Sequence, residues 1–213
     1  MIFRTEEKEF VCAVCGESSK HEIIIEQEDP KGAPDLDMRP DEPVRSGIKY
    51  WVSKCPCCGY CNSFINIPVK FTREYLDSPN YNREGDDLAG RFMKKSLACE
   101  KNKEWEEALK SCMYAAWVCD DEGDSERAAE CRRAAVRIFD THGTVFKENA
   151  DIKLLAADLL RRSGAFDRVI HDYKNYHFGS PLIMAIAAFE VKLAEQGDAA
   201  CHKADEIPGV RAK

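Results

Sequence analysis

Two CxxCG motifs constrain this chain more than any other feature of its sequence. The first spans Cys12–Gly16 and the second Cys55–Gly59, with the 39 residues 16–54 between their nearest cysteines. A CxxC pair on a tight turn directs two sulfur atoms at one point, and Zn²⁺ prefers a closed tetrahedral set of four thiolates. The glycine suits a turn position with positive φ, which a side chain disfavours. The motifs therefore predict one structural zinc ion per chain, with four metal ligands: Cys12, Cys15, Cys55 and Cys58.

A second ligand register exists in the second motif, because Cys58 and Cys61 also form a CxxC pair. The Cys55 and Cys58 pair is favoured, since proline after the first cysteine and glycine after the second fit a metal-binding turn better. Cys57 and Cys61 are then thiols beside the metal or free thiols. A less favoured alternative has them recruit His21 to a second metal ion.

Cysteine usage and charge indicate the compartment and the class of partner. The odd count of eleven cysteines leaves at least one thiol unpaired, and Met1–Lys8 carries charge where a signal peptide has an apolar segment. We therefore expect a cytoplasmic protein with reduced thiols, which favours metal binding over disulfides. Redox enzymes place CxxC at a helix N-terminus beside a βαβ unit, and no such pattern follows either motif.

The acidic balance and the hydropathy pattern exclude two classes of partner. A net charge of −7 argues against binding to nucleic acid, which requires clustered lysine and arginine. No run of eighteen apolar residues is present, so the sequence predicts no membrane span.

The chain changes character near residue 85, which predicts an α+β fold in two domains. Residues 1–84 form a small β-rich zinc-ribbon domain that contains both CxxCG motifs. Within it, residues 29–43 are rich in proline and carboxylates and predict an irregular acidic loop between the motifs. Residues 85–213 form an all-α domain. The predicted strands of the ribbon are 22–26, 49–53 and 64–69.

Apolar residues recur at helical spacing beyond residue 85. One stripe contains Trp105, Ala108, Leu109, Cys112, Ala116 and Cys119, and a second contains Ala128, Cys131, Ala135 and Ile138. Asp124 or Ser125 predicts a helix start and Gly143 a helix end, while Ser180 and Pro181 predict another start. Gly164 and Gly197 are predicted to separate helical segments.

These glycines also reveal an irregular internal repeat. Arg162–Val169 resembles Lys103–Ala108, and Gly123–Ala128 and Gln196–Ala200 are fainter copies. A tight turn, an aromatic residue and a helix with a small inward residue are typical of tetratricopeptide-type hairpins. The sequence predicts about three antiparallel helical hairpins whose concave face holds a protein or peptide segment.

Five segments form a specific set that covers nearly the whole chain: Cys12–Gly16, Pro34–Pro40, Trp51–Val52, Cys55–Tyr60 and Arg161–Gly164. As a set they resemble an uncharacterised bacterial family that joins a CxxCG and CPxCGY zinc ribbon to a tetratricopeptide-like helical region. The resemblance implies a fold and a metal, but no activity.

Asp35-Leu36-Asp37-Met38-Arg39 is the best candidate for catalysis or ligand binding outside the cysteines. Its two carboxylates could bind a hard cation or act as acid and base. We favour a structural alternative, in which Asp35 caps a turn and Arg39 pairs with Asp37 to pin the loop on the ribbon.

The other cysteines and histidines carry weaker predictions. Small buried thiols pack well at helix crossings, so core packing is expected for Cys99, Cys112, Cys119 and Cys131. The histidines of the helical part are scattered and are expected to face solvent or cap helix ends: His142, His171, His177 and His202.

Together, these observations predict a cytoplasmic, non-enzymatic interaction protein with structural zinc and a tetratricopeptide-like array. The alternative is a metal- or thiol-dependent enzyme with its site at the junction of ribbon and helices, using Asp35, Asp37 and the spare thiols. No serine-hydrolase, P-loop or zinc-protease motif is present.

Overall fold

Two antiparallel β-hairpins carry the two CxxCG motifs in the computed structural model, which describes residues 3–209. The long hairpin pairs β1 (Phe3–Val11) with β2 (Ser18–Gln27), and the first motif forms its turn. The short hairpin pairs β3 (Ser53–Lys54) with β4 (Cys61–Asn62), and the second motif forms that turn. A hairpin turn is where a metal-binding CxxC is expected.

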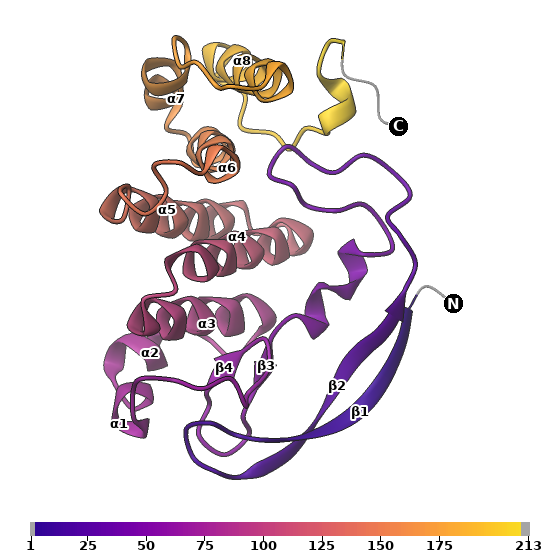
Figure 1. Ribbon diagram of the computed structural model, residues 1–213, viewed down its shortest axis with the longest axis vertical. Helices are drawn as coiled ribbons and strands as arrows, with labels where there is room; N and C mark the ends of the chain where they lie inside the picture. The colour runs from indigo at the N-terminus through magenta and orange to yellow at the C-terminus, as the bar shows by residue number, and fades with distance from the viewer. Residues whose placement is uncertain (1–2, 210–213) are drawn as a thin grey trace.

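Helices follow the hairpins and stack in chain order from α3 to α8, as Figure 1 shows. Neighbouring helices run antiparallel. The most extensive packing between helices is that of α4 against α3 and α5. The chain therefore has the predicted α+β composition, with a small β region followed by a helical region. The helices are α1 (Arg73–Leu76), α2 (Pro79–Arg83), α3 (Leu88–Asn102), α4 (Trp105–Glu122), α5 (Ser125–Thr141), α6 (Ala150–Arg162), α7 (Phe166–Tyr173) and α8 (Pro181–Glu195).

Local signals predicted several of these helix ends. The Asp124 side chain accepts a hydrogen bond from the backbone N–H of Arg127 and caps α5, while Gly123 takes φ +76° to end α4. Gly164 separates α6 from α7 with φ +85°. Gly197 follows α8 with φ +68°, but a 3₁₀ helix at Ala204–Glu206 comes next instead of another α-helix.

The cysteines predicted to pack in the helical core are buried there. Cys99, Cys112, Cys119 and Cys131 are at most 4% exposed and lie on α3, α4 and α5. All eleven cysteines are free thiols. Among residues 3–209, no helix is both long enough and apolar enough to cross a lipid bilayer.

Two of the three predicted strands are wrong. The segment 22–26 lies within β2, but 49–53 contains the end of a 3₁₀ helix (Arg45–Tyr50), and 64–69 forms a turn and irregular chain. Their apolar residues do not alternate across a sheet. Val52 and Ile65 instead bury single side chains, against the helices and beside the cysteines respectively.

The strand β1 was not predicted, because five of its nine residues are charged. It forms by pairing along its whole length with β2. Most of its side chains face solvent, so the hairpin depends on backbone pairing more than on a hydrophobic face.

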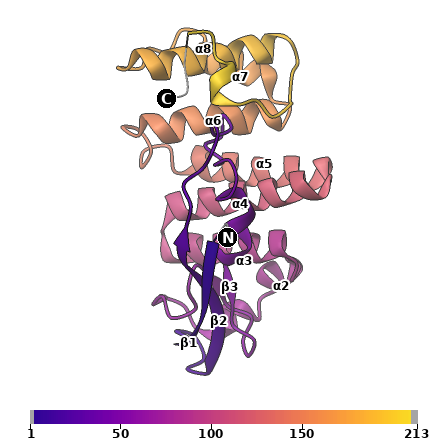
Figure 2. The same cartoon turned by 90° about the vertical axis from the view of Figure 1, so that its right-hand side faces the viewer.

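The N-terminal part runs along the side of the helical stack instead of lying at one end, as the side view in Figure 2 shows. Its acidic loop, residues 29–43, reaches up toward α8 and the C-terminal segment in Figure 1. Ile48, Val52 and Cys61 belong to the same hydrophobic core as the helices. The domain boundary near residue 85 stays a prediction, and apolar packing crosses it.

Candidate metal centre

The two CxxCG motifs fold into matching turns. In the first, the backbone N–H of Gly16 donates to the carbonyl of Cys12 at 2.9 Å, and in the second Gly59 donates to Cys55 at 3.0 Å. Gly16 and Gly59 take φ values of +77° and +75°. Both lie in the left-handed region that glycine adopts without steric cost, which explains the residue type at each position.

These turns bring four sulfur atoms together. The ligand atoms of Cys12, Cys15, Cys55 and Cys58 all lie within 4.8 Å of one another. Sγ of Cys12 lies 3.6 Å from Sγ of Cys58, and Sγ of Cys15 lies 3.7 Å from Sγ of Cys55. A tetrahedral Zn²⁺ with Zn–S distances near 2.3 Å requires S–S separations of about 3.8 Å. The four residues therefore fit a tetrathiolate metal site.

Aromatic and backbone contacts hold the two turns in place. The backbone N–H of Ala13 donates to the carbonyl of Ile65 at 2.8 Å, which ties the first turn to the chain that follows the second. The Tyr81 hydroxyl on α2 donates to the carbonyl of Gly59 and accepts from the N–H of Cys61. Ala98 of α3 packs in the same cluster. The cysteine site is thus fixed to the start of the helical stack.

The spare thiols stand outside the four-sulfur cluster. Cys61 is buried, donates its thiol hydrogen to the carbonyl of Gly59 at 3.4 Å and packs with the helical core. Cys57 is exposed. His21 lies on β2, where its ring contacts the Ser19 hydroxyl at 2.8 Å. The arrangement favours the register with Cys55 and Cys58, and it does not bring Cys57, Cys61 and His21 into a second cluster.

The crowded thiols do not ionise equally. Burial raises the pKa of Cys15, but the backbone N–H of Glu17 and the neighbouring thiols outweigh burial and lower its pKa to about 7. Burial raises the pKa of Cys58 and of Cys12. A divalent cation bound by the four sulfur atoms favours ionisation of all four thiols.

The acidic loop is pinned on the helices, not on the ribbon as predicted. The Asp37 side chain has 0% exposure. Its Oδ2 accepts hydrogen bonds from Nε1 of Trp117 at 2.7 Å and from Nη1 of Arg162 at 2.9 Å. Burial and the nearby Asp158 carboxylate raise the pKa of Asp37, while Arg162 and Trp117 oppose the shift.

The other charged residues of the loop take different partners from those predicted. The Arg39 guanidinium pairs with Asp121 of α4 and lies over the Trp117 ring, 5.6 Å from its centroid. Only the backbone N–H of Arg39 contacts the Asp37 carboxylate. Asp35 pairs with Arg45 at 3.1 Å. The predicted Arg39–Asp37 ion pair is wrong, because Arg162 and Trp117 already occupy the Asp37 carboxylate.

A second buried ionic group lies in the upper part of the stack. Arg161 is fully buried and donates to Glu190 of α8 at 2.5 Å, to Asp158 at 2.8 Å and to two carbonyls, those of Asp198 and Ala200. Burial and Asp158 raise the pKa of Glu190 to about 8. Burial next to a second carboxylate therefore disfavours the charged form of Glu190, while Arg161 opposes that shift.

The residues of the predicted enzyme alternative are not brought together. Asp35 and Asp37 are buried against the helices and the C-terminal segment. Cys57 and Cys61 lie instead at the short hairpin, at the opposite end of the stack in Figure 1.

Several buried charged residues of the helical stack were missed from sequence. Glu190 offered a signal, since it is the single charged residue in the apolar run Pro181–Val191. Arg132 offered another, since it lies between the buried stripe residues Cys131 and Ala135. It donates to Asp120, which also accepts from Arg162.

Comparisons with known protein families, with curated proteins and with solved structures find no match to this chain.

Proposed function

We propose that this chain is a non-enzymatic, cytoplasmic interaction module with two parts. Zn²⁺ held by Cys12, Cys15, Cys55 and Cys58 serves as a structural staple, and α3–α8 form a tetratricopeptide-like array that binds a peptide segment of a partner protein. The resemblance to the uncharacterised bacterial ribbon family is part of the same proposal.

The observation that carries the proposal is a groove between α3 and α5. Two cavities of about 370 and 270 Å³ share Arg83, Glu84, Met93, Ala134 and Arg137 in their linings, so they form one continuous groove. Cys112 of α4 lies in its lining, between the two flanking helices. Proteins built of helical repeats bind extended peptides in a groove of this kind, in which alternate helices of the stack form the two walls.

The charges of the groove indicate the chemistry of the peptide. Within residues 3–209, the guanidinium groups of Arg83, Arg133 and Arg137 have no carboxylate within 4.0 Å. Glu84, Glu100 and Glu130 also line the groove, but none of their carboxylates lies within 4.0 Å of these three guanidinium groups. Unpaired guanidinium groups bind carboxylates in a bidentate manner. The peptide therefore carries at least one carboxylate, set against Arg133 and Arg137.

Selection of binding peptides from a displayed random library, with the full zinc-loaded chain as the target, tests this proposal. We expect enrichment of peptides that contain Asp or Glu, and loss of their binding by at least about tenfold in Arg133→Glu/Arg137→Glu, because each charge-assisted bond contributes about 1.5–3 kcal/mol. Lys31→Glu/Lys147→Glu reverses two exposed charges outside this groove and is the control for net charge. Enrichment without acidic residues, or equal binding by all variants, would contradict the groove assignment.

The full chain is the right protein for this test. A fragment that begins near residue 86 lacks Ile48 and Val52, which pack in the helical core. Such a fragment exposes apolar surface on α3 and α4 and would capture proteins non-specifically.

A further inference from the structure

A separate cavity of about 370 Å³ lies on the other side of the stack, between β2, the 3₁₀ helix Arg45–Tyr50 and the helices α3 and α4. Figure 1 shows β2 across from these helices, with residues 45–54 between them. The volume is in the range of small-molecule sites, which occur preferentially where two parts of a protein meet. Neither the cysteine site nor the α3–α5 groove includes it.

A β-bulge shapes one wall of this cavity. Arg4 pairs with Glu26 and Thr5 pairs with Ile24, so Ile25 is an extra residue in β2. The extra residue lets Ile24 and Gln27, three positions apart, face the same way. Both approach Gly47, where an added Cβ would lie 3.1 Å from Ile24 Cδ1 and 3.2 Å from Gln27 Oε1. Gly47 thus keeps this wall free of a clash.

Aromatic rings form the other walls. Trp51 and Tyr114 meet edge to face, with ring centroids 5.3 Å apart. Tyr50 and Phe64 also line the cavity, and the Phe64 side chain is 41% exposed. Flat apolar rings of this kind favour a planar apolar ligand.

A buried ammonium group gives the cavity its charge. Lys95 of α3 lines the cavity and is 3% exposed. Its Nζ donates to Oγ of Ser63 at 2.8 Å, and its contact with Glu107 is 3.4 Å long. The Glu107 side chain is 52% exposed, so its carboxylate is largely solvated. An ammonium carries three donors, and burial makes an under-compensated charge costly. The Lys95 ammonium therefore favours an anion at this position.

We propose that this cavity binds a small organic anion, in which a planar apolar body lies against Trp51 and Tyr114 and a carboxylate accepts a hydrogen bond from Lys95. The ligand carboxylate takes the place of Glu107, which turns to solvent. The site is independent of the peptide groove and of the metal.

Three matched probes test the charge preference by calorimetry on the full zinc-loaded chain: 2-naphthoate, 2-naphthalenemethanol and 2-naphthylmethylammonium. We expect 2-naphthoate to bind at least about tenfold more tightly than the alcohol, because its hydrogen bond to Lys95 is charge-assisted. The ammonium probe should bind weakest. The indole N–H resonance of Trp51, assigned with Trp51→Phe, should shift with 2-naphthoate and so locate the site.

Two variants of opposite effect link the preference to Lys95. Lys95→Met should abolish the advantage of 2-naphthoate over the alcohol, and Glu107→Gln should increase it by removing the competing carboxylate. Lys110→Met, which removes a lysine paired with Glu106 on α4, is the matched control and should leave all three affinities unchanged. Thermal unfolding of each variant confirms that it is folded.

Equal affinities for the three probes, preference for the ammonium probe, or no binding of 2-naphthoate at millimolar concentration would each overturn the proposal. Unchanged affinities in Glu107→Gln would overturn it as well, even if Lys95→Met failed to fold.

Discussion

The two ends of the N-terminal part are attached to the helical stack by two different kinds of chemistry, with the apolar packing of Ile48 and Val52 between them. At the cysteine end, thiols and aromatic rings pack on α2 and α3. At the loop end, charged side chains of residues 35–39 are buried against α4 and α6. The first attachment uses groups that tolerate burial, whereas the second depends on complete pairing, because an unpaired buried charge is costly. Mutations at the two ends should therefore have different effects: loss of metal at the cysteine end and exposure of an unpaired charge at the loop end.

Cys12→Ser should have the largest effect. Loss of one of four thiolates opens the closed tetrahedral site and weakens metal binding, and the apparent binding free energy of about 10–16 kcal/mol in structural zinc peptides is also their folding free energy. We expect one zinc per chain in the native protein and none in the variant by native mass spectrometry. The residues near both motifs should lose amide protection, while most of the helical circular dichroism remains.

Cys57→Ser is the matched control, because this exposed thiol lies within the second motif but outside the four-sulfur cluster. It should retain one zinc. Native protein without metal after purification in zinc, or equal zinc loss in both variants, would argue against the proposed site.

Asp37→Ala should have the next largest effect and act at the loop end alone. It leaves the Trp117 N–H without an acceptor and Arg162 with Asp120 alone, and a buried donor left unsatisfied costs about 1–3 kcal/mol. Urea unfolding should show this loss, and limited proteolysis should cleave residues 29–43 faster, with zinc content unchanged.

Asp29→Ala provides the comparison for the same loop, since Asp29 is exposed. Its effect should stay within about 0.5 kcal/mol. A loss below about 1 kcal/mol in Asp37→Ala would show that the buried pairing does not hold the loop.

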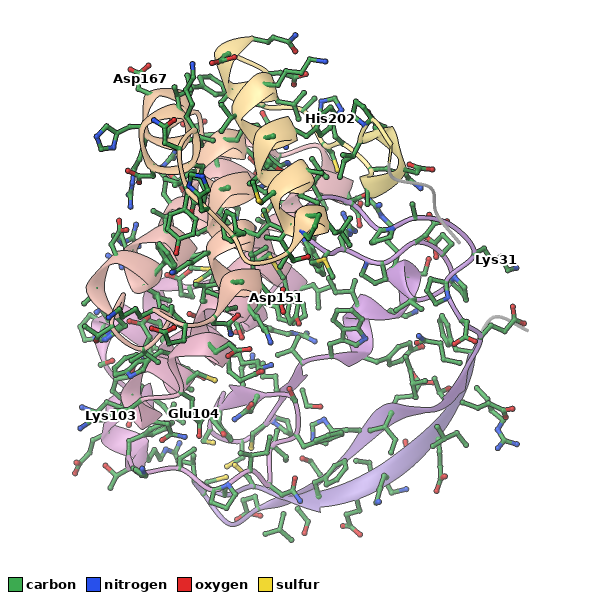
Figure 3. The ribbon with its side chains drawn as sticks, turned by 45° about the horizontal axis from the view of Figure 1, so that its top comes forward. Lys31, Lys103, Glu104, Asp151, Asp167 and His202 are labelled. Atoms are coloured by element: carbon green, nitrogen blue, oxygen red, sulfur yellow. The ribbon has the colours of Figure 1, made fainter. Side chains whose placement is uncertain are left out.

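The smallest expected effect is a pH dependence of the contact between the loop and the C-terminal segment. The backbone N–H of Leu36 donates to the carbonyl of His202. Figure 3 shows His202 on the C-terminal segment, and Lys31 at the outer bend of the loop. The two ring nitrogens of His202 contact Glu206 at 2.7 Å and Asp198 at 3.0 Å.

Burial lowers the pKa of His202, but the hydrogen bonds with Glu206 and Asp198 outweigh burial and raise it. The resulting stabilisation is fully present below the unfolded pKa of about 6.5 and is lost as pH rises through the folded pKa. It should amount to about 1 kcal/mol or less. Amide exchange at Leu36 and Ala204, corrected for intrinsic rates, should show faster opening at high pH.

Two histidine variants separate this contact from general titration. His202→Gln should remove the pH dependence, and His171→Gln should not, because the His171 side chain is 87% exposed. The hydrogen bond to Asp41 raises the pKa of Lys203, so this neighbour keeps its charge across the range. Unchanged pH dependence in His202→Gln would contradict the assignment.

The difference between the cysteine end and the loop end explains how much of the fold and of the candidate site could be predicted from the sequence. The cysteine end is encoded locally, since each CxxCG motif specifies its own turn and only the meeting of the two turns is long-range. The helix stripes are local too, and the cysteines at 99, 112, 119 and 131 were predicted to be buried for that reason. The fold class and the four clustered cysteines follow from such patterns.

The loop end is encoded by pairs far apart in the chain. Asp37 and Arg162 are 125 residues apart, and no local pattern links them. Strands 49–53 and 64–69 were mispredicted for a related reason. Their β-branched and aromatic residues indicate burial, but whether they meet a sheet or a helix depends on tertiary contacts.

The contact between the loop and the C-terminal segment also sets an order of events during synthesis. Leu36 and Asp35 take backbone partners from His202 and Lys203, and Leu36 packs with Ile207. Both CxxCG turns are complete once about residue 60 has left the ribosome, whereas the loop must wait for residues 198–207. Since proteins fold largely from the N-terminus during synthesis, the acidic loop is the last part of the N-terminal region to be buried. Until then its carboxylates remain solvated.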